Sequence, residues 1–174
     1  RKNFKRIATA SGISWWEWNC QSDMVTSGDE KTTMLGYEQG EIGSGYSDWT
    51  KLIHPEDLGI ATKALNDHIS GKTDMYEADY RVLSKNGEYF WYKDKGGIIK
   101  RDGKKRPLIL SGVVMNITSE KKLIKEKEKE HLLAQKVIHE TDKKYESLFN
   151  TLPLGVVFQD SDGKIINANP MAEK

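Results

Sequence analysis

The sequence contains very little cysteine and no long apolar run. Its 174 residues include a single cysteine, Cys20. One cysteine excludes an internal disulfide and a metal site built from paired cysteines, and so sparse a use of cysteine is typical of the cytosol. No stretch approaches the roughly 18 apolar residues of a membrane span, and no signal peptide is visible. We therefore expect a cytoplasmic chain without a membrane segment.

An excess of charge of one sign is also lacking. The chain carries 27 Lys and Arg against 26 Asp and Glu, for a net charge of +1. Without a basic field, nucleic acid and anionic membranes are not expected as partners. The length suits one ordinary core of roughly 100 to 150 residues with a remainder. Because the chain starts at Arg1 and not at a methionine, we expect it to be a piece of a longer protein.

Residue patterns that indicate an enzyme are missing as well. The sequence shows no nucleophile with a matching base and no paired catalytic carboxylates, and the "GSG" of residues 43–45 lacks the strand, lysine and helix of a phosphate-binding loop. His139-Glu140 matches the first letters of the phosphoacceptor motif of histidine kinases, but the following "TDKKYESLF" does not continue that motif. We interpret this dipeptide as part of a helix surface and expect no catalytic activity.

Strand and turn signals are clear between residues 75 and 117. "MYEADYRVLS" and "YFWYKDKGGII" are rich in aromatic and β-branched residues, and Asn86-Gly87 between them suits a type I′ turn. A second turn at Asp102-Gly103 leads to "RPLILSGVVMNIT". Upstream, "GISWWEWNCQ" and "SDMVTSGDE" have the character of a strand and its short partner. The sequence therefore predicts five antiparallel strands.

Short helices are expected between the second and third strands. "DEKTTMLGY" indicates one or two helical turns that end at Gly36. "LIHPEDLGIATKALNDHISGK" is a stronger helix signal, because Pro55 suits the first helical position and Gly71 the end. In this helix Leu58, Ala61 and Leu65 share a face. The order of elements predicts an α+β domain in which helices cover one face of an antiparallel sheet.

Five motifs occur in the order and at the spacing of a known family. They are "LGYEQGEI", "IHPEDL", "YRVLSKNGEYFWYKDKGGII", "LILSGVVM" and the terminal "NIT". Together they resemble a PAS sensor domain with its C-terminal PAC segment, and "WWEWN" is similar to the aromatic first strand of one large PAS subfamily. The resemblance covers residues 1–118. It implies the PAS fold, a five-stranded antiparallel sheet with a helix-lined cavity on one face.

The same resemblance accounts for the abrupt change from an apolar strand to a charged segment after residue 115. In PAS domains the last strand leaves the sheet through an Asp-Ile-Thr triplet and continues as a signalling helix. Here the triplet is Asn116-Ile117-Thr118, which the resemblance marks as the signal junction. Asn116 replaces the aspartate, so a charged contact is not expected at this position, although the amide can still form hydrogen bonds.

The charged segment 119–150 is expected to be a helix that dimerises. Two series of positions spaced by seven residues run through it: Ile124, His131, Ile138 and Tyr145, and Lys127, Ala134, Thr141 and Leu148. The polar members weaken this seam. We expect a parallel coiled coil, and hence a homodimer through the C-terminal helix, with a dimer seam at Ile124, Ile138, Tyr145 and Leu148. A weak seam suits a switch, since a stable zipper would resist small rotations.

Beyond this helix the chain repeats its own beginning. "FKRIATASGISWWEWNCQSD" and "YESLFNTLPLGVVFQDSD" superpose, with Ile7 on Leu148. We expect residues 151–174 to be the truncated start of a second PAS domain, after a sensor domain at 1–118 and a helical linker at 119–150. Because a lone hairpin is unstable in water, the apolar runs of this tail are expected to pack against another chain or against the linker helices.

No haem or flavin signature is present. A haem-binding PAS subfamily ligates iron from the helix that His54 and His68 flank, but Leu65 is nearer than His68 to the axial position. Cys20 lies on the first strand, outside the sequence context of the flavin-binding light sensors. We expect a colourless protein with no haem, flavin or metal, in which any ligand is a small non-covalent molecule between the sheet and the central helix.

Two functions fit these expectations. The leading hypothesis is a non-enzymatic sensory and dimerisation module of a prokaryotic signal-transduction protein, such as a histidine kinase or a cyclic-dinucleotide enzyme. Its partners would be neighbouring PAS and output domains. The alternative is a ligand-free structural PAS that relays a signal between tandem copies. The presence and identity of a ligand would separate the two.

Overall fold

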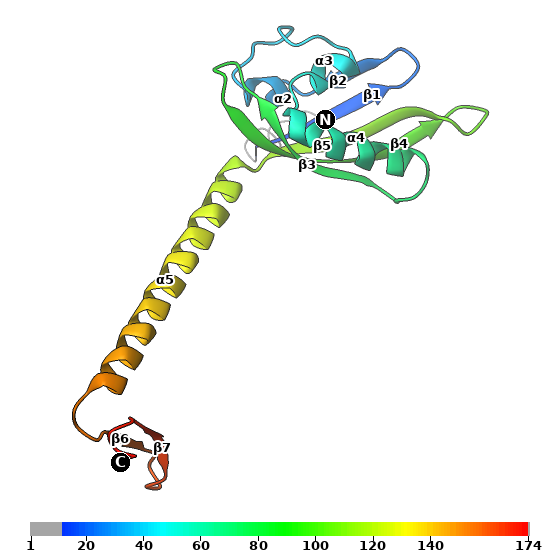
Figure 1. Cartoon of the computed structure of the whole chain (residues 1–174). Coiled ribbons are helices and arrows are strands. Elements are labelled where there is room, and N and C mark those ends of the chain that lie inside the picture. Colours follow the sequence, from blue (N-terminus) through cyan, green and yellow to red (C-terminus); the bar gives the residue numbers. More distant parts are fainter. Residues whose placement is uncertain (1–11, 174) are drawn as a thin grey trace. The chain divides into compact units, whose positions relative to one another are not determined.

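The structure, a computed structural model, describes residues 12–173 (Figure 1). The chain divides into two compact units, residues 1–122 and 123–174. The first holds the sheet, and the second holds most of the long helix with a hairpin. Ile7, which the internal repeat aligns with Leu148, lies outside the described residues.

Five antiparallel strands form one sheet, as the strand and turn signals predict. They are β1 (Ile13–Asn19), β2 (Met24–Ser27), β3 (Tyr76–Leu83), β4 (Tyr89–Arg101) and β5 (Pro107–Asn116). Their order is β2-β1-β5-β4-β3, which puts β5 at the centre and β2 and β3 at the edges. β1 pairs with both β2 and β5, so the first strand lies beside the last one.

The turn between β3 and β4 is not of the type predicted. Of Asn86-Gly87, only Gly87 has a positive φ, at 86°. The Gly87 N–H donates to the Ser84 carbonyl, and the Ser84 N–H donates to the carbonyl four residues on. This is a three-residue loop closed by a left-handed residue, whereas a type I′ turn needs a positive φ at both central residues. At the second turn the left-handed residue is Lys105, at 61°, and not Gly103.

Three helices cover one face of the sheet (Figure 1). They are α2 (Glu30–Thr33), α3 (Tyr46–Thr50) and α4 (Pro55–Ile69). α4 begins and ends as predicted, because Pro55 is its first residue and Gly71, at φ 79°, follows its C-terminus. The α+β fold expected from the sequence, with helices on one face of the sheet, is confirmed.

The buried face of α4 differs by one residue from the face that Leu58, Ala61 and Leu65 share. Ala61 and Leu65 are buried, but Leu58 is 37% exposed, and Asp57 is buried instead. The physical reason is electrostatic. Arg81 of β3 donates three hydrogen bonds to the Asp57 carboxylate, and these bonds offset the desolvation of its charge.

The core lies between the sheet and the helices. Because side chains alternate along a strand, Trp16 of β1 is buried on the helix side while its neighbour Trp15 lies on the opposite face. Leu110 and Val114 of β5 are completely buried. Burying an apolar side chain of this size stabilises the fold by about 1.5–3 kcal/mol, so the central strand anchors the domain.

Helix α5 (Thr118–Thr151) follows β5 after a single residue and runs for 34 residues without a break. At about 1.5 Å per residue it is roughly 51 Å long. The long helix expected after the sheet is therefore confirmed. Within residues 12–173, none of the helices combines the length and the apolarity that a membrane crossing needs.

The second unit ends in a two-stranded hairpin, β6 (Val157–Gln159) and β7 (Ile165–Ala168). The ring of Phe158 lies 5.7 Å from the ring of Phe149 in α5. Asn169 is completely buried and donates to the carbonyls of Phe149 and Leu154. The hairpin thus packs against the end of the linker helix, one of the two partners that the sequence suggested for the tail.

Candidate functional site

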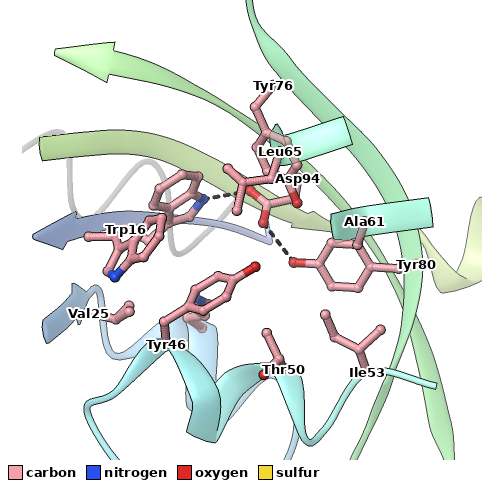
Figure 2. Close-up of a pocket in the computed structure, with 12 residues that line it drawn as sticks. Trp16, Val25, Tyr46, Thr50, Ile53, Ala61, Leu65, Tyr76, Tyr80 and Asp94 are labelled. Carbon is pink, nitrogen blue, oxygen red and sulfur yellow. Dashed lines mark hydrogen bonds between the residues drawn. The ribbon is translucent and has the colours of Figure 1, made fainter. Parts of the chain in front are cut away.

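A small cavity lies between the sheet and helices α3 and α4 (Figure 2). Aromatic side chains form much of its wall: Trp16, Trp18, Tyr46, Tyr76 and Tyr80. Its volume is about 60 Å³. At about 10–15 Å³ for each water molecule, this is room for roughly four to six waters, or for one molecule of a few heavy atoms.

The carboxylate of Asp94 on β4 is the most buried charge beside the cavity. It accepts hydrogen bonds from the indole N–H of Trp16, at 2.6 Å, and from the hydroxyl of Tyr80, at 2.7 Å, as the dashed lines in Figure 2 show. Burial raises the pKa of Asp94, while the positive charge of Lys31 and the two hydrogen bonds act in the opposite direction. Burial likewise raises the pKa of Tyr80 well above its ordinary value. Asp94 is not predictable from the sequence as a site residue, because an aspartate inside an aromatic strand has no distinguishing signal.

Lys31 of α2 supplies the opposite charge. It is only 7% exposed, and burial lowers its pKa to about 8. Its Nζ lies 3.8 Å from the centre of the Trp49 ring, a cation–π contact that favours the charged form. The cavity therefore offers one buried acid, one buried base and several tyrosine hydroxyls within an aromatic wall, an arrangement suited to a small polar molecule or to ordered water.

Lys31 makes the stability of the domain depend on pH. Its folded pKa of about 8 lies below the ordinary value of 10.5, so the unfolded chain binds more protons between these values and stability rises with pH. From pH 7 to 9.5 this group is expected to add about 2 kcal/mol to the free energy of unfolding. Chemical denaturation at both pH values, compared with Lys31→Met, isolates the effect. If the variant shows the same increase as the wild type, Lys31 is not its source.

The predicted signal junction is hydrogen-bonded to β4 at Trp91. The Asn116 side-chain oxygen accepts from the Thr118 N–H, at 3.0 Å, and from the Thr118 hydroxyl, at 2.6 Å. The Thr118 Oγ1 in turn accepts from the Trp91 N–H, and the Ile117 N–H donates to the Trp91 carbonyl, both at 2.9 Å. The neutral amide of Asn116 thus forms hydrogen bonds where the usual aspartate is missing. Trp91 is not predictable from the sequence as part of the junction, because its position opposite the end of β5 depends on strand register.

The predicted seam residues are all exposed in the single chain. Ile124, Ile138 and Leu148 are between 53% and 61% exposed. Tyr145 is 46% exposed, and its ring stacks on the ring of Phe149 with centres 5.7 Å apart. Part of the Tyr145 surface is therefore covered within the same chain. Exposed apolar residues outside the predicted frame also occur on this helix: Leu132, Leu133 and Val137.

The two histidines that flank α4 are engaged by the fold. The Nδ1 of His68 donates to the Thr73 carbonyl at 2.9 Å, and its Nε2 accepts from the Ile98 N–H at 3.2 Å. The Nδ1 of His54 accepts from the N–H of Glu56 at the start of α4. Among the residues described, no group of three His, Cys, Asp or Glu side chains could hold a metal ion.

A family model for the PAS fold matches residues 25–114 of this chain of 174 residues. The chain belongs to the PAS family. A second family model, for the PAS domain, matches residues 143–174. The resemblance drawn from the five sequence motifs is thus confirmed, and the cavity beside Asp94 occupies the helix-covered face of the PAS sheet.

Curated relatives of this PAS domain are sensor proteins. The methyl sulfide methyltransferase-associated sensor of Methanosarcina acetivorans is 29% identical over 118 residues, which are 67% of this chain and 12% of that protein. Sensor protein TdiS of Thauera aromatica is 25% identical over 165 residues, which are 78% of this chain and 29% of that protein. The chain thus spans less than a third of the length of either relative.

Solved PAS structures agree with the fold. A sensory box histidine kinase/response regulator from Burkholderia thailandensis superposes with a TM-score of 0.63 at 20% identity, over 79% of this chain and 98% of that one. The N-terminal domain of a diguanylate cyclase with a PAS/PAC sensor from Marinobacter aquaeolei gives 0.55 at 28% identity, over 62% and 97%. Taken with the curated relatives, these findings support a signal-transduction sensory module.

Proposed function

We propose that this PAS domain is a non-enzymatic sensory and dimerisation module of a prokaryotic signal-transduction protein, in the cytoplasm. It passes a conformational signal from the sheet through Asn116-Ile117-Thr118 to α5, which pairs with a second copy as a coiled coil. Kinase or cyclase activity would belong to output domains of the parent protein. In this proposal residues 1–118 sense, residues 119–150 transmit, and residues 151–174 begin a second PAS domain.

One observation carries this proposal. The Thr118 hydroxyl bridges the side chain of Asn116 and the backbone of Trp91, so the first turn of α5 is hydrogen-bonded to strand β4. Asp94 lies three residues further along β4 and lines the cavity. A change at the cavity that shifts β4 therefore moves the start of the helix, because packed elements transmit displacement through contiguous contacts.

A second candidate is the ligand-free relay between tandem PAS domains. The small size of the cavity favours it, since water could satisfy Asp94 and Lys31 without any ligand. The match of a PAS family model to residues 143–174, which begins within the last turns of α5, fits a tandem arrangement. Native mass spectrometry of the purified chain separates the two candidates: a retained small molecule favours the sensor, and the bare chain mass favours the relay.

The junction is tested by Thr118→Val, which keeps the shape of the side chain but removes its hydroxyl. We expect the amides of Trp91 and Lys121 to exchange about fivefold faster, because the Trp91 N–H loses its acceptor. The dimer dissociation constant should rise about threefold, because the start of the coiled coil is no longer held by the sheet. Exchange is measured by NMR and association by sedimentation.

Ser119→Ala is the matched control for the junction, because it removes a hydroxyl from the next residue, which is exposed. It should leave both measurements unchanged. If Thr118→Val loosens the junction while dimerisation stays the same, the junction does not transmit to the helix and the proposed mechanism fails.

A further inference from the structure

A network of charges surrounds the free edge of the sheet at β3. The residues Glu77, Asp79 and Arg81 alternate with buried residues of this strand and lie on the face opposite the helices. Arg81 also reaches around the edge, where Asp57 at the start of α4 accepts from its backbone N–H, its Nε and its Nη2 at 2.8–2.9 Å. These hydrogen bonds hold the pKa of Asp57 below its usual range. α4 is thus bound to the opposite face of the sheet through one arginine.

The first turn of α5 is held on that opposite face by a second cation. The Nζ of Lys121 lies 2.8 Å from the Asp79 carboxylate. It also lies 4.9 Å from the centre of the Trp91 ring, the same ring that the Arg81 guanidinium carbon approaches to 5.5 Å. Arg81 and Trp91 are partners in the β3–β4 register. The Trp91 indole therefore lies between two cations from different elements, one of which is paired with Asp79.

We propose that Arg81 and Lys121 are alternative partners of Asp79. While Asp57 accepts hydrogen bonds from Arg81, the Asp79 carboxylate is available to Lys121. When α4 moves, Arg81 leaves Asp57 and Glu56, which also accepts from its Nη2 at 2.8 Å, and turns to Asp79. It then displaces Lys121 and releases the first turn of α5. The inference rests on the proposed function, because it assigns the signal that reaches the junction to this edge of the sheet.

The geometry allows the exchange of partners. Asp79 and Arg81 are two residues apart on one strand, about 7 Å between Cα atoms, which an arginine side chain spans. The side chains involved are only partly exposed, 29% for Asp79, 27% for Arg81 and 36% for Lys121, so their charges are incompletely screened by solvent. Lys93 lies 3.8 Å from Asp79 as well, which leaves this carboxylate little capacity for a third cation.

The cavity supplies a cause for the motion of α4. Ala61 and Leu65 of this helix line the cavity, and Asp57 lies on the turn before them. A molecule larger than the cavity's volume of about 60 Å³ must displace its wall on entering or leaving, because protein interiors are close-packed. Displacement of α4 acts directly on the bond between Asp57 and Arg81. This edge route reaches α5 independently of the hydrogen bonds at Thr118.

Asp57→Asn, made in the whole 174-residue chain, tests the first step, in which Arg81 leaves Asp57. The substitution weakens the hold on Arg81, and we expect the Lys121 N–H, which donates to the Ile117 carbonyl, to exchange about fivefold faster by NMR. Asp67→Asn is the control, since Asp67 lies on the same helix but pairs with lysines away from this edge. If the exchange rate of the Lys121 amide is unchanged in Asp57→Asn, the proposal is overturned. It is also overturned if the core amide of Val114 exchanges faster by the same factor.

Lys121→Met tests the reverse direction and removes no buried group. Because coupling is reciprocal, freeing Asp79 should draw Arg81 from Asp57 and speed exchange of the Arg81 N–H about threefold. Lys122→Met, at an exposed position, should have no effect. Adding Asp79→Asn to Lys121→Met should restore slow exchange, because Arg81 then has no new partner.

If the Arg81 N–H still exchanges fast in the double variant, the exchange of partners is contradicted. It is also contradicted if the exchange rate of the Arg81 N–H is unchanged in Lys121→Met. All of these amides lie between residues 57 and 121, within the first unit. These exchange rates can therefore be measured in a monomer, and they do not depend on whether α5 forms a coiled coil.

Discussion

Ile138→Lys is expected to convert a dimer of this chain largely to monomer at micromolar concentration. Ile138 is 61% exposed in the single chain, and in a parallel coiled coil its position faces the same residue of the second copy. Lysine there would bring two ammonium groups together and bury them without a counter-ion. Because His131 and Thr141 already weaken the seam, little other burial compensates. Sedimentation velocity over a range of concentrations measures the effect.

Leu133→Lys is the matched control for the seam. Leu133 is 63% exposed on the same helix but lies outside the predicted heptad frame, so its replacement should leave the dimer intact. The opposite result, dissociation by Leu133→Lys alone, would show that the frame is wrong. A dimer undiminished in both variants would point to another surface. The aromatic face around Trp16 and Trp18 is one candidate for that surface, with Trp18 the more exposed of the two.

The parts of the fold that local chemistry determines could be predicted from the sequence. Pro55 and Gly71 fixed the two ends of α4, because each suits only one kind of helix position. The type of the Asn86-Gly87 turn was predicted wrongly, for a reason that lies beyond the local sequence. Five residues between two paired strands leave room for more than one loop, and the register of β3 on β4 selects the one in which only Gly87 is left-handed.

The candidate site was less accessible to sequence reasoning. Asn116 to Thr118 could be placed at the junction by resemblance, but their contact with Trp91 depends on pairing between β4 and β5. The buried face of α4 is not predictable for a similar reason. Leu58 is the more apolar residue, yet Asp57 is buried because Arg81, far along the chain, satisfies its charge. Apolar periodicity does not detect such long-range ion pairs.

Asp94→Ala is expected to lower the free energy of unfolding by about 4 kcal/mol. The carboxylate is buried and is the acceptor for the Trp16 indole and the Tyr80 hydroxyl. Its removal leaves both donors without this acceptor and Lys31 without its nearby opposite charge, and unpaired buried groups are more costly than missing contacts. Denaturant unfolding followed by tryptophan fluorescence measures the loss.

Asp94→Asn separates the hydrogen bonds from the charge. The amide oxygen can still accept from the Trp16 indole, so we expect about half the loss seen with alanine. The remaining loss belongs to the interaction with Lys31, and Lys31→Met added to Asp94→Asn should recover part of it, because no buried charge is then left unpaired. If alanine costs less than about 1.5 kcal/mol, water in the cavity replaces the carboxylate as acceptor. Asp94 would then be a group that the cavity tolerates, and the domain would be stable with water in its place.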